Sequence, residues 1–176
     1  ESVRVSKSIR DNLWELNMEI ASTGTPQAFE NCQVKLRDHK GDEYLRFLGT
    51  VPGSRYKLQH VNNRSTVIGY DQAWYLTKQY LSPEQLNVGL DDNSGWNDWD
   101  DVVEDLLNET GIESYRLRNP GSYSAEYYDK RFSFQPGTTK MQAINEIAKA
   151  CNFVFAVKPR WDGAEWISSA YFVNIT

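Results

Sequence analysis

The stretch Tyr44–Lys78, with the sequence YLRFLGTVPGSRYKLQHVNNRSTVIGYDQAWYLTK, decides how the first half of this 176-residue chain folds. Apolar residues alternate with polar ones around Phe47 and again over 56–60, and a period of two residues predicts β-strands. The polar segment 61–64 predicts a turn, after which Ser65–Ile68 begins a return strand. The stretch therefore predicts a ribbon of antiparallel strands.

Two residues near the end of this ribbon are expected to have structural roles. Gly69 and Asp71 interrupt the return strand, and a glycine inside a strand marks a bulge or a close approach of another backbone. We expect the bulky run Trp74–Leu76 to resume the strand. No catalytic motif lies in this part of the chain.

Further strands are predicted on the N-terminal side of the ribbon. Apolar residues occupy every second position of Trp14–Ile20, which predicts a half-buried strand. A weaker alternation over Ser2–Ile9 is typical of an edge strand, and Cys32–Leu36 predicts another strand that ends in a turn. Joined to the ribbon, these segments predict an antiparallel barrel or sandwich over residues 1–81.

The pattern changes from strand to helix after residue 82. The apolar residues of Trp99–Thr110 fall at helical spacing, and the acids of its first turn favour the positive end of the helix dipole. A second helix is predicted to begin near Thr138 and to bury a stripe from Met141 to Cys151. Alternation over 153–157 and over the final segment 166–175 predicts a closing hairpin.

We therefore predict an α+β protein, in which a mainly antiparallel β-barrel or sandwich precedes a smaller α+β domain with two helices. The predicted domains are an antiparallel β domain at 1–81, an acidic linker at 82–97, and an α+β domain with its closing hairpin at 98–176.

Charge is distributed unevenly along the chain, whose net charge is −5. Of the 24 acids, ten lie in the segment 82–114, which holds no Lys or Arg, so 14 acids and 19 bases remain elsewhere. An acidic segment of this kind either forms a surface that contacts a partner or is the hydrated face of a helix. The ten acids are Glu84, Asp91, Asp92, Asp98, Asp100, Asp101, Glu104, Asp105, Glu109 and Glu113.

The sequence lacks the local motifs of common hydrolases, nucleotide-binding enzymes and zinc proteases. We therefore expect neither enzymatic activity nor a cofactor, and no metal site of the zinc type. Cys32 and Cys151 are expected to be packed side chains, the alternative being one long-range disulfide. Asp91, Asn93, Gly95 and Asn97 recur at every second position, which fits either a flexible acidic loop or a calcium loop.

The order of these pieces is more informative than any one of them. The pieces are the strand end 67–71 followed by Leu76, the helix 99–107, the strand 132–134, the helix 138–148 and the aromatic strand 152–155. In order and spacing they resemble the hub proteins of contractile and siphophage tails, the late control protein D-like and tail-associated protein families. The resemblance covers residues 44–158.

The resemblance implies a structural protein of a phage or prophage tail hub or baseplate. It implies a homo-oligomer, with three subunits, that docks other tail proteins and resides in the virion tail, or in the host cytoplasm before assembly. We expect no nucleic-acid partner and no membrane insertion, since no run approaches 18 apolar residues. The hub's second β domain is mostly missing, and the chain ends in mid-strand, so we expect a fragment of a longer hub.

The expected interface joins the acidic helix to nearby aromatic residues, because complementary charge orients subunits while apolar contact holds them. Its residues are Trp96, Trp99, Asp100, Asp101, Glu104, Tyr127 and Tyr128. The alternative is a carbohydrate-binding β module, in which surface aromatics stack on sugar rings. Its residues would be Trp74, Tyr75, Trp96, Trp99 and Trp161.

Overall fold

The computed structural model describes residues 2–7, 13–21, 29–52, 56–59, 64–88, 99–110, 112, 114–117 and 131–174. The protein is α+β and divides into two compact units. The first unit comprises residues 1–72 with 159–168, and the second comprises 73–158 with 169–176. The boundary falls after residue 72, whereas the sequence pattern predicted it at residue 81. The tip of the last hairpin is grouped with the first unit.

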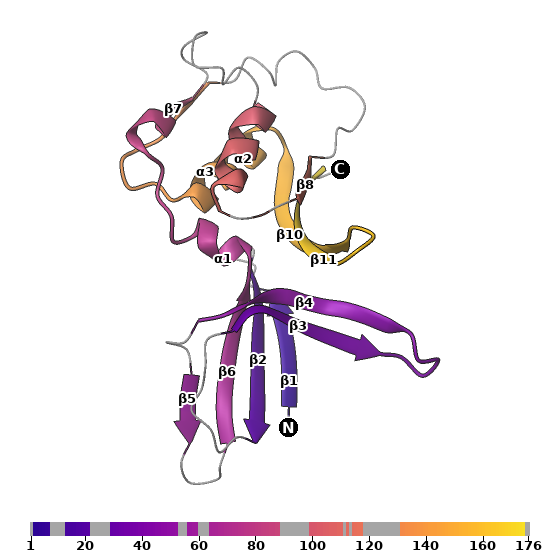
Figure 1. The fold of residues 1–176 in the computed structure, drawn as a ribbon. Helices are drawn as coiled ribbons and strands as arrows, with labels where there is room; N and C mark the ends of the chain where they lie inside the picture. Colours follow the sequence, from indigo (N-terminus) through magenta and orange to yellow (C-terminus); the bar gives the residue numbers. More distant parts are fainter. Residues whose placement is uncertain are drawn as a thin grey trace. The chain divides into compact units, whose positions relative to one another are not determined.

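Six strands of the first unit form one antiparallel sheet that curls into a half-barrel (Figure 1). Its order is β1-β2-β6-β4-β3, and β5 also pairs with β6. Among the described residues the end strands β1 and β3 do not pair with each other, so the predicted barrel is half-formed here instead of closed. The strands are β1 (Ser2–Lys7), β2 (Trp14–Ala21), β3 (Phe29–Arg37), β4 (Glu43–Val51), β5 (Tyr56–Gln59) and β6 (Arg64–Asp71).

β6 is the strand on which the sheet is built. One of its edges pairs with β2 along Arg64–Tyr70, while the other edge is shared between two strands. β5 pairs with residues 64–67 of β6, and β4 pairs with Tyr70 and Asp71. The predicted interruption at Gly69 is wrong, because the strand continues to Asp71 and Gly69 keeps its regular pairing with Leu16.

Two glycines allow β4 to reach β6. A Cβ at Gly49 would lie 2.1 Å from the carbonyl oxygen of Tyr70, closer than real Cβ atoms approach any neighbour. A Cβ at Gly69 would lie 3.2 Å from the carbonyl oxygen of Thr50 and 3.3 Å from Cγ2 of Val51. The predicted close backbone approach at Gly69 is thus confirmed, and Gly49, which the sequence pattern did not single out, is the tighter of the two positions.

Asp71 has the structural position that its place in the sequence suggested. Its side chain is buried, and its Oδ2 accepts a hydrogen bond of 2.9 Å from the backbone N–H of Trp14. Since Trp14 begins β2 and Asp71 ends β6, this bond ties the two strands together beyond the last pair of their ladder.

The segment after β6 is helical, which corrects the predicted strand at Trp74–Leu76. The short helix α1 (Ala73–Leu76) buries Ala73 and Leu76, which lie three residues apart on one helical face. The Trp74 carbonyl at the helix end accepts hydrogen bonds from the Thr77 N–H at 3.0 Å and from Thr77 Oγ1 at 2.7 Å. Local burial at helical spacing here outweighs the strand propensity of the aromatic residues.

In its described residues the second unit contains α1, two longer helices, three short strands and most of a long hairpin. α2 (Trp99–Asn108) and α3 (Lys140–Ala150) pack against each other. The strand β8 (Ser114–Leu117) pairs in parallel with β11 (Trp166–Asn174), which also neighbours β10 (Phe153–Trp161). The remaining elements are the 3₁₀ turn η2 (Pro83–Gln85) and the strands β7 (Asn87–Val88) and β9 (Phe132–Ser133), which pair antiparallel.

Both predicted helices are confirmed, with small differences at their ends. α2 ends at Asn108, two residues before the predicted end at Thr110. α3 begins at Lys140, where Thr139 Oγ1 accepts a hydrogen bond from the Gln142 N–H and the Gln142 side chain accepts one from the Thr139 N–H. This reciprocal capping box fixes the start of α3.

The core of the second unit is made by the two predicted apolar stripes and the aromatic hairpin. The fully or nearly fully buried side chains include Val102, Val103, Leu106, Leu107, Ile112, Met141, Ile144, Ile147, Ala148, Cys151, Phe153, Phe155 and Phe172. The Phe172 ring lies 5.9 Å from that of Phe153 and 5.8 Å from that of Phe155, centroid to centroid. Cys32 and Cys151 are both free thiols, and Cys32 is half-buried while Cys151 is buried.

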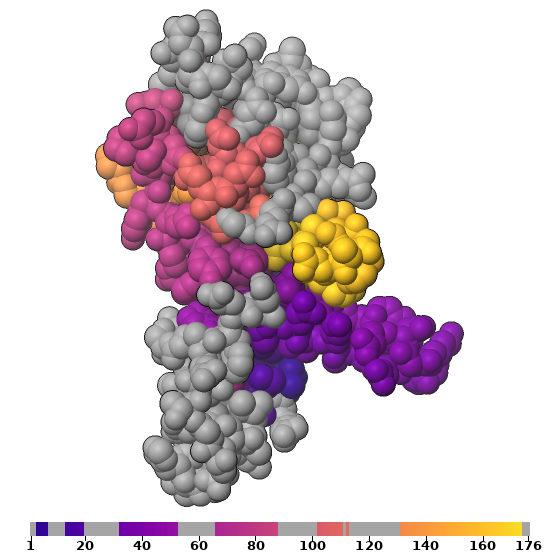
Figure 2. All heavy atoms as spheres, viewed as in Figure 1, coloured from indigo at the N-terminus to yellow at the C-terminus, as the bar shows by residue number. Residues whose placement is uncertain are grey.

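The β3–β4 hairpin extends beyond the other strands of its own sheet (Figures 1 and 2). Its loop is closed by the Asp38 N–H, which donates 3.0 Å to the Asp42 carbonyl, and by the Gly41 N–H, which donates 3.1 Å to the Asp38 carbonyl. Gly41 has φ +90°, the conformation in which a three-residue hairpin loop needs glycine. The predicted turn after Leu36 is confirmed.

We predict that Gly49→Ala destabilises the first unit by more than about 3 kcal/mol, because the new methyl group overlaps a backbone carbonyl that β-pairing holds in place. Gly69→Ala should cost less, about 1 kcal/mol, since its neighbours need to shift by only tenths of an ångström. Denaturant unfolding of the full chain measures both. Gly41→Ala, whose Cβ meets no atom within 4 Å, is the control for backbone strain alone. A loss at Gly49 no larger than that at Gly41 would contradict the close-approach explanation.

We further predict that Leu106→Ala costs about 2–5 kcal/mol, since the side chain is 1% exposed in the core of the second unit. Asn108→Ala, an exposed position on the same helix, should change the free energy of unfolding by less than about 0.5 kcal/mol. Urea melts followed by circular dichroism provide the measurement. Equal losses at the two positions would mean that α2 is not packed through this stripe.

Candidate functional site

The predicted interface residues lie on and around α2, and the structure describes them in part. Trp99, Asp100 and Asp101 occupy the first turn of α2, and Glu104 lies one turn further with a half-buried side chain. Trp96, Tyr127 and Tyr128 lie outside the described residues. The structure thus brings four of the seven predicted residues onto one helix.

The acids at the C-terminal end of α2 are not explained by the stability of the helix. The acids of the first turn are favourable, but Asp105 and Glu109 lie at the end where the helix dipole disfavours negative charge, and the last turn has no basic residue. Asp101, Asp105 and Glu109 also follow one another at a spacing of four residues, where like charges repel by a few tenths of a kcal/mol. Packing of the buried stripe stabilises the helix, so the acidic residues can serve another purpose.

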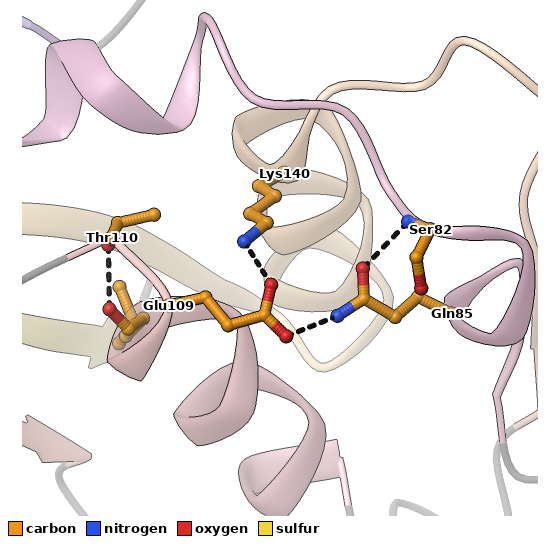
Figure 3. Close-up of polar contacts among 6 residues, drawn as sticks. Ser82, Gln85, Glu109, Thr110 and Lys140 are labelled. Atoms are coloured by element: carbon orange, nitrogen blue, oxygen red, sulfur yellow. Dashed lines mark hydrogen bonds and ion pairs between the residues drawn. The ribbon is translucent and has the colours of Figure 1, made fainter.

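One of these acids takes part in a built polar network (Figure 3). Glu109 Oε2 forms an ion pair with Lys140 Nζ, and Glu109 Oε1 accepts a hydrogen bond of 2.8 Å from Gln85 Nε2. Gln85 Oε1 in turn accepts a hydrogen bond of 2.8 Å from the Ser82 N–H. The network therefore joins the end of α2, the start of α3 and the 3₁₀ turn η2.

The two charges of the ion pair are unequally buried. The Lys140 side chain is 4% exposed, whereas that of Glu109 is 53% exposed. A buried ammonium without an anionic partner is costly, while a half-exposed carboxylate can be hydrated. Glu109 is therefore the anionic partner of the buried Lys140 side chain, and the main role of the network is to fix the second unit's elements.

Sequence reasoning missed this network, although one signal for it exists. Lys140 is the first residue of α3, directly after the N-cap Thr139, where the helix dipole disfavours a cation. A lysine at that position suggests a nearby acid, and the acidic segment 82–114 supplies one. Which acid pairs with it depends on tertiary packing.

The aromatic residues proposed for sugar stacking fall into separate groups. Trp74 and Tyr75 lie on α1 with ring centroids 5.4 Å apart, and Lys78 Nζ lies 5.6 Å from the Trp74 ring centroid. Trp161 is 51% exposed and meets Trp166 edge to face at 5.7 Å, a partner that the sequence did not suggest. Trp96 lies outside the described residues, as does the side chain of Trp99.

The turn beside Trp161 is ordered by Asp162. Its Oδ1 accepts hydrogen bonds of 2.8 Å from the N–H groups of Glu165 and Ala164. These bonds hold the pKa of the Asp162 carboxyl below its ordinary value, and the bond from Glu165 has the largest effect. The hairpin tip therefore presents Trp161 from a preformed turn at neutral pH.

The described part of the chain shows neither a metal-binding cluster nor a membrane-spanning helix. No group of three or more His, Cys, Asp or Glu residues there is placed to bind a metal ion, while the possible calcium loop Asp91–Asn97 lies outside it. Among the same residues, no helix is both long enough and apolar enough to cross a membrane.

The comparison with solved structures gives a match over the entire fold. The crystal structure of the prophage MuSo2 43 kDa tail protein from Shewanella oneidensis aligns with 99% of this chain at a TM-score of 0.59 and 11% sequence identity. The two proteins share a fold. The chain spans about half of that protein, with 51% of its length covered. No family model and no curated protein sequence matches the chain.

We predict that the two halves of the ion pair respond differently to substitution. Glu109→Gln should cost about 3 kcal/mol, because it leaves the buried Lys140 ammonium without an anion. Lys140→Met should cost less than about 1 kcal/mol, because it removes the buried charge and leaves a hydrated carboxylate. Denaturant unfolding measures both, with the exposed Glu146→Gln on α3 as the control. Equal losses for Glu109→Gln and Lys140→Met would show that water reaches the ammonium.

Proposed function

We propose that this chain is a structural component of a phage or prophage tail, in the hub or baseplate, where it assembles with copies of itself and docks other tail proteins. The observation that carries the proposal is the fold shared with the MuSo2 tail protein across 99% of the chain, which includes both units. The order and spacing of the sequence elements, which resemble those of tail hub proteins, support the same assignment.

Self-assembly through the acidic helix would explain why the acidic residues of the chain are concentrated in one segment. The segment 82–114 contains ten acids and no bases, and the acids at the end of α2 oppose the helix dipole. One subunit can present this helix to the more basic surface of the next, which is a head-to-tail contact of the kind that closes rings. Three subunits are proposed from the resemblance, and the virion tail is the proposed location.

The proposed role contains no catalytic step and no cofactor. It rests on contact between protein surfaces, in which exposed ion pairs orient the partners and apolar residues supply most of the affinity. The proposed apolar residues are Trp96, Trp99, Tyr127 and Tyr128. The proposal includes neither a nucleic-acid partner nor membrane insertion.

A carbohydrate-binding module is the second candidate, and one observation favours it. Trp161 is half exposed beside a preformed hairpin turn and makes an edge-to-face contact with Trp166. An exposed indole face of this kind can stack on a sugar ring, and the adjacent Asp162 provides a carboxylate near the ring. This candidate predicts a monomer that binds glycans through Trp161.

Sedimentation of the full chain at several ionic strengths tests the proposal. We expect association into trimers that strengthens as salt is lowered, because exposed charges are screened at high salt. Asp105→Asn should weaken this association and at the same time leave the fold slightly more stable, because it removes an acid from the unfavourable end of α2. Weaker association together with a higher free energy of unfolding would indicate an effect on the interface, because a folding defect would lower both.

Glu146→Gln, an exposed acid on α3 outside the acidic segment, is the matched control and should leave association unchanged. A monomer at every salt concentration, up to millimolar protein, would refute the assembly proposal. If such a monomer also bound glycans and lost binding on Trp161→Ala, the second candidate would replace it.

A further inference from the structure

The outer part of the β3–β4 hairpin extends beyond its own sheet, and most of its side chains are exposed. Of residues 35–46, all are exposed except Asp38 and Leu45, which are intermediate. Leu36 and Tyr44 are paired directly across the two strands and are 49% and 52% exposed. We call these two residues the apolar pair. A two-stranded ribbon is marginally stable by itself in water, so an uncovered one with an apolar pair at its centre suggests a missing partner.

The hairpin is nevertheless well ordered by its own contacts. Arg37 and Glu43, the next cross-strand pair, form an ion pair of 2.7 Å. Asp38 Oδ1 accepts hydrogen bonds from the Lys40 and Asp42 N–H groups at 2.8 and 3.0 Å. A preformed hairpin loses little conformational entropy when it binds, which favours its use as a docking element.

Charge is polarised along the hairpin, with the apolar pair between the two ends. On the side toward the rest of the sheet lie two cations, Lys35 and Arg46. On the side toward the loop lie two acids, Asp38 and Asp42, with one cation, Lys40. Arg37 and Glu43 neutralise each other. The base of the hairpin is therefore positive, and its tip carries a net negative charge.

We propose that the β3–β4 hairpin pairs with the same hairpin of a second copy of this chain across a two-fold axis. In that arrangement the apolar pairs of the two copies meet, and the base of each hairpin lies against the tip of the other. A two-fold contact repeats every interaction, so Arg46 of one copy faces Asp42 of its partner, and Asp42 of the first faces Arg46 of the partner. Within one chain these residues are four positions apart, about 13 Å along an extended strand, which is too far for an ion pair.

This contact is independent of the proposed tail function, because it rests on the hairpin alone. The distribution of charge along the hairpin favours a second copy of the chain over an unrelated partner. A uniformly charged hairpin would repel its own copy and require a partner of opposite sign, whereas a polarised hairpin is complementary to itself when reversed. The contact also differs from the head-to-tail contact of the acidic helix, so the two can be tested separately.

Charge exchange provides the test, measured by sedimentation of the full chain. Arg46→Glu alone and Asp42→Lys alone each turn two attractive contacts into two repulsive ones, and each should weaken self-association about tenfold or more. An equal mixture of the two variants should recover association, because a mixed dimer restores both contacts. The double variant Arg46→Glu with Asp42→Lys should recover it as well. Leu36→Asp should abolish the contact, while Val3→Asp, at a position 53% exposed on β1, should not.

The outcomes separate this contact from the head-to-tail one. The two-fold pairing is supported if each single variant loses self-association and the equal mixture of the two recovers it, provided that thermal melts show every variant folded. Loss without recovery on mixing would overturn it, because the hairpin would then bind a different surface. Association unaffected by Arg46→Glu, Asp42→Lys and Leu36→Asp, yet weakened by Asp105→Asn, would also overturn it and leave the head-to-tail contact standing.

Discussion

The approach of β4 to the end of β6 is the constraint on which the first unit depends. β6 offers one edge to β2 and divides the other between β5 and β4, so β4 reaches it only at Gly49 and Thr50. At that point the backbone of β4 lies where a side chain at position 49 would overlap the Tyr70 carbonyl. Because Gly49 has no side chain, the sheet can turn there, and the β3–β4 hairpin can leave the line of the other strands (Figure 1).

The second unit is held by a different balance of forces. Its two longer helices, α2 and α3, bury apolar stripes, which supply most of the stabilisation, since burial of aliphatic and aromatic area dominates folding. The polar network of Glu109, Lys140 and Gln85 adds specificity of arrangement, because a buried ammonium tolerates few positions relative to its partner. Such a network connects three segments that are far apart in the sequence.

The two units bear on function through their surfaces. Asp105, an acid near the end of α2 that the helix dipole disfavours, and an ordered hairpin whose outer side chains are mostly exposed are both features that stability alone does not require. Features of this kind suit a protein that works by assembly, where residues are retained for contacts that a single chain does not make. The fold is shared with a phage tail protein at 11% identity, since packing patterns are retained through sequence changes that preserve volume and polarity.

Periodicity and local chemistry in the sequence by themselves determined the α+β class, the strands of the first sheet, both long helices and the residues that they bury. These depend on spacings of two and of three to four residues, and such spacings are written in adjacent positions. The Gly69 close approach and the structural position of Asp71 could also be predicted, since each residue type has few uses inside a strand. The helical turn at Trp74–Leu76 could not, because burial of Ala73 and Leu76 outweighed aromatic strand propensity. Only the tertiary structure decided that Gly49 meets the Tyr70 carbonyl, that Lys140 pairs with Glu109 among ten acids of the segment, and that Leu36 and Tyr44 stay uncovered. Each of these depends on which distant backbone comes near, and no local pattern specifies that.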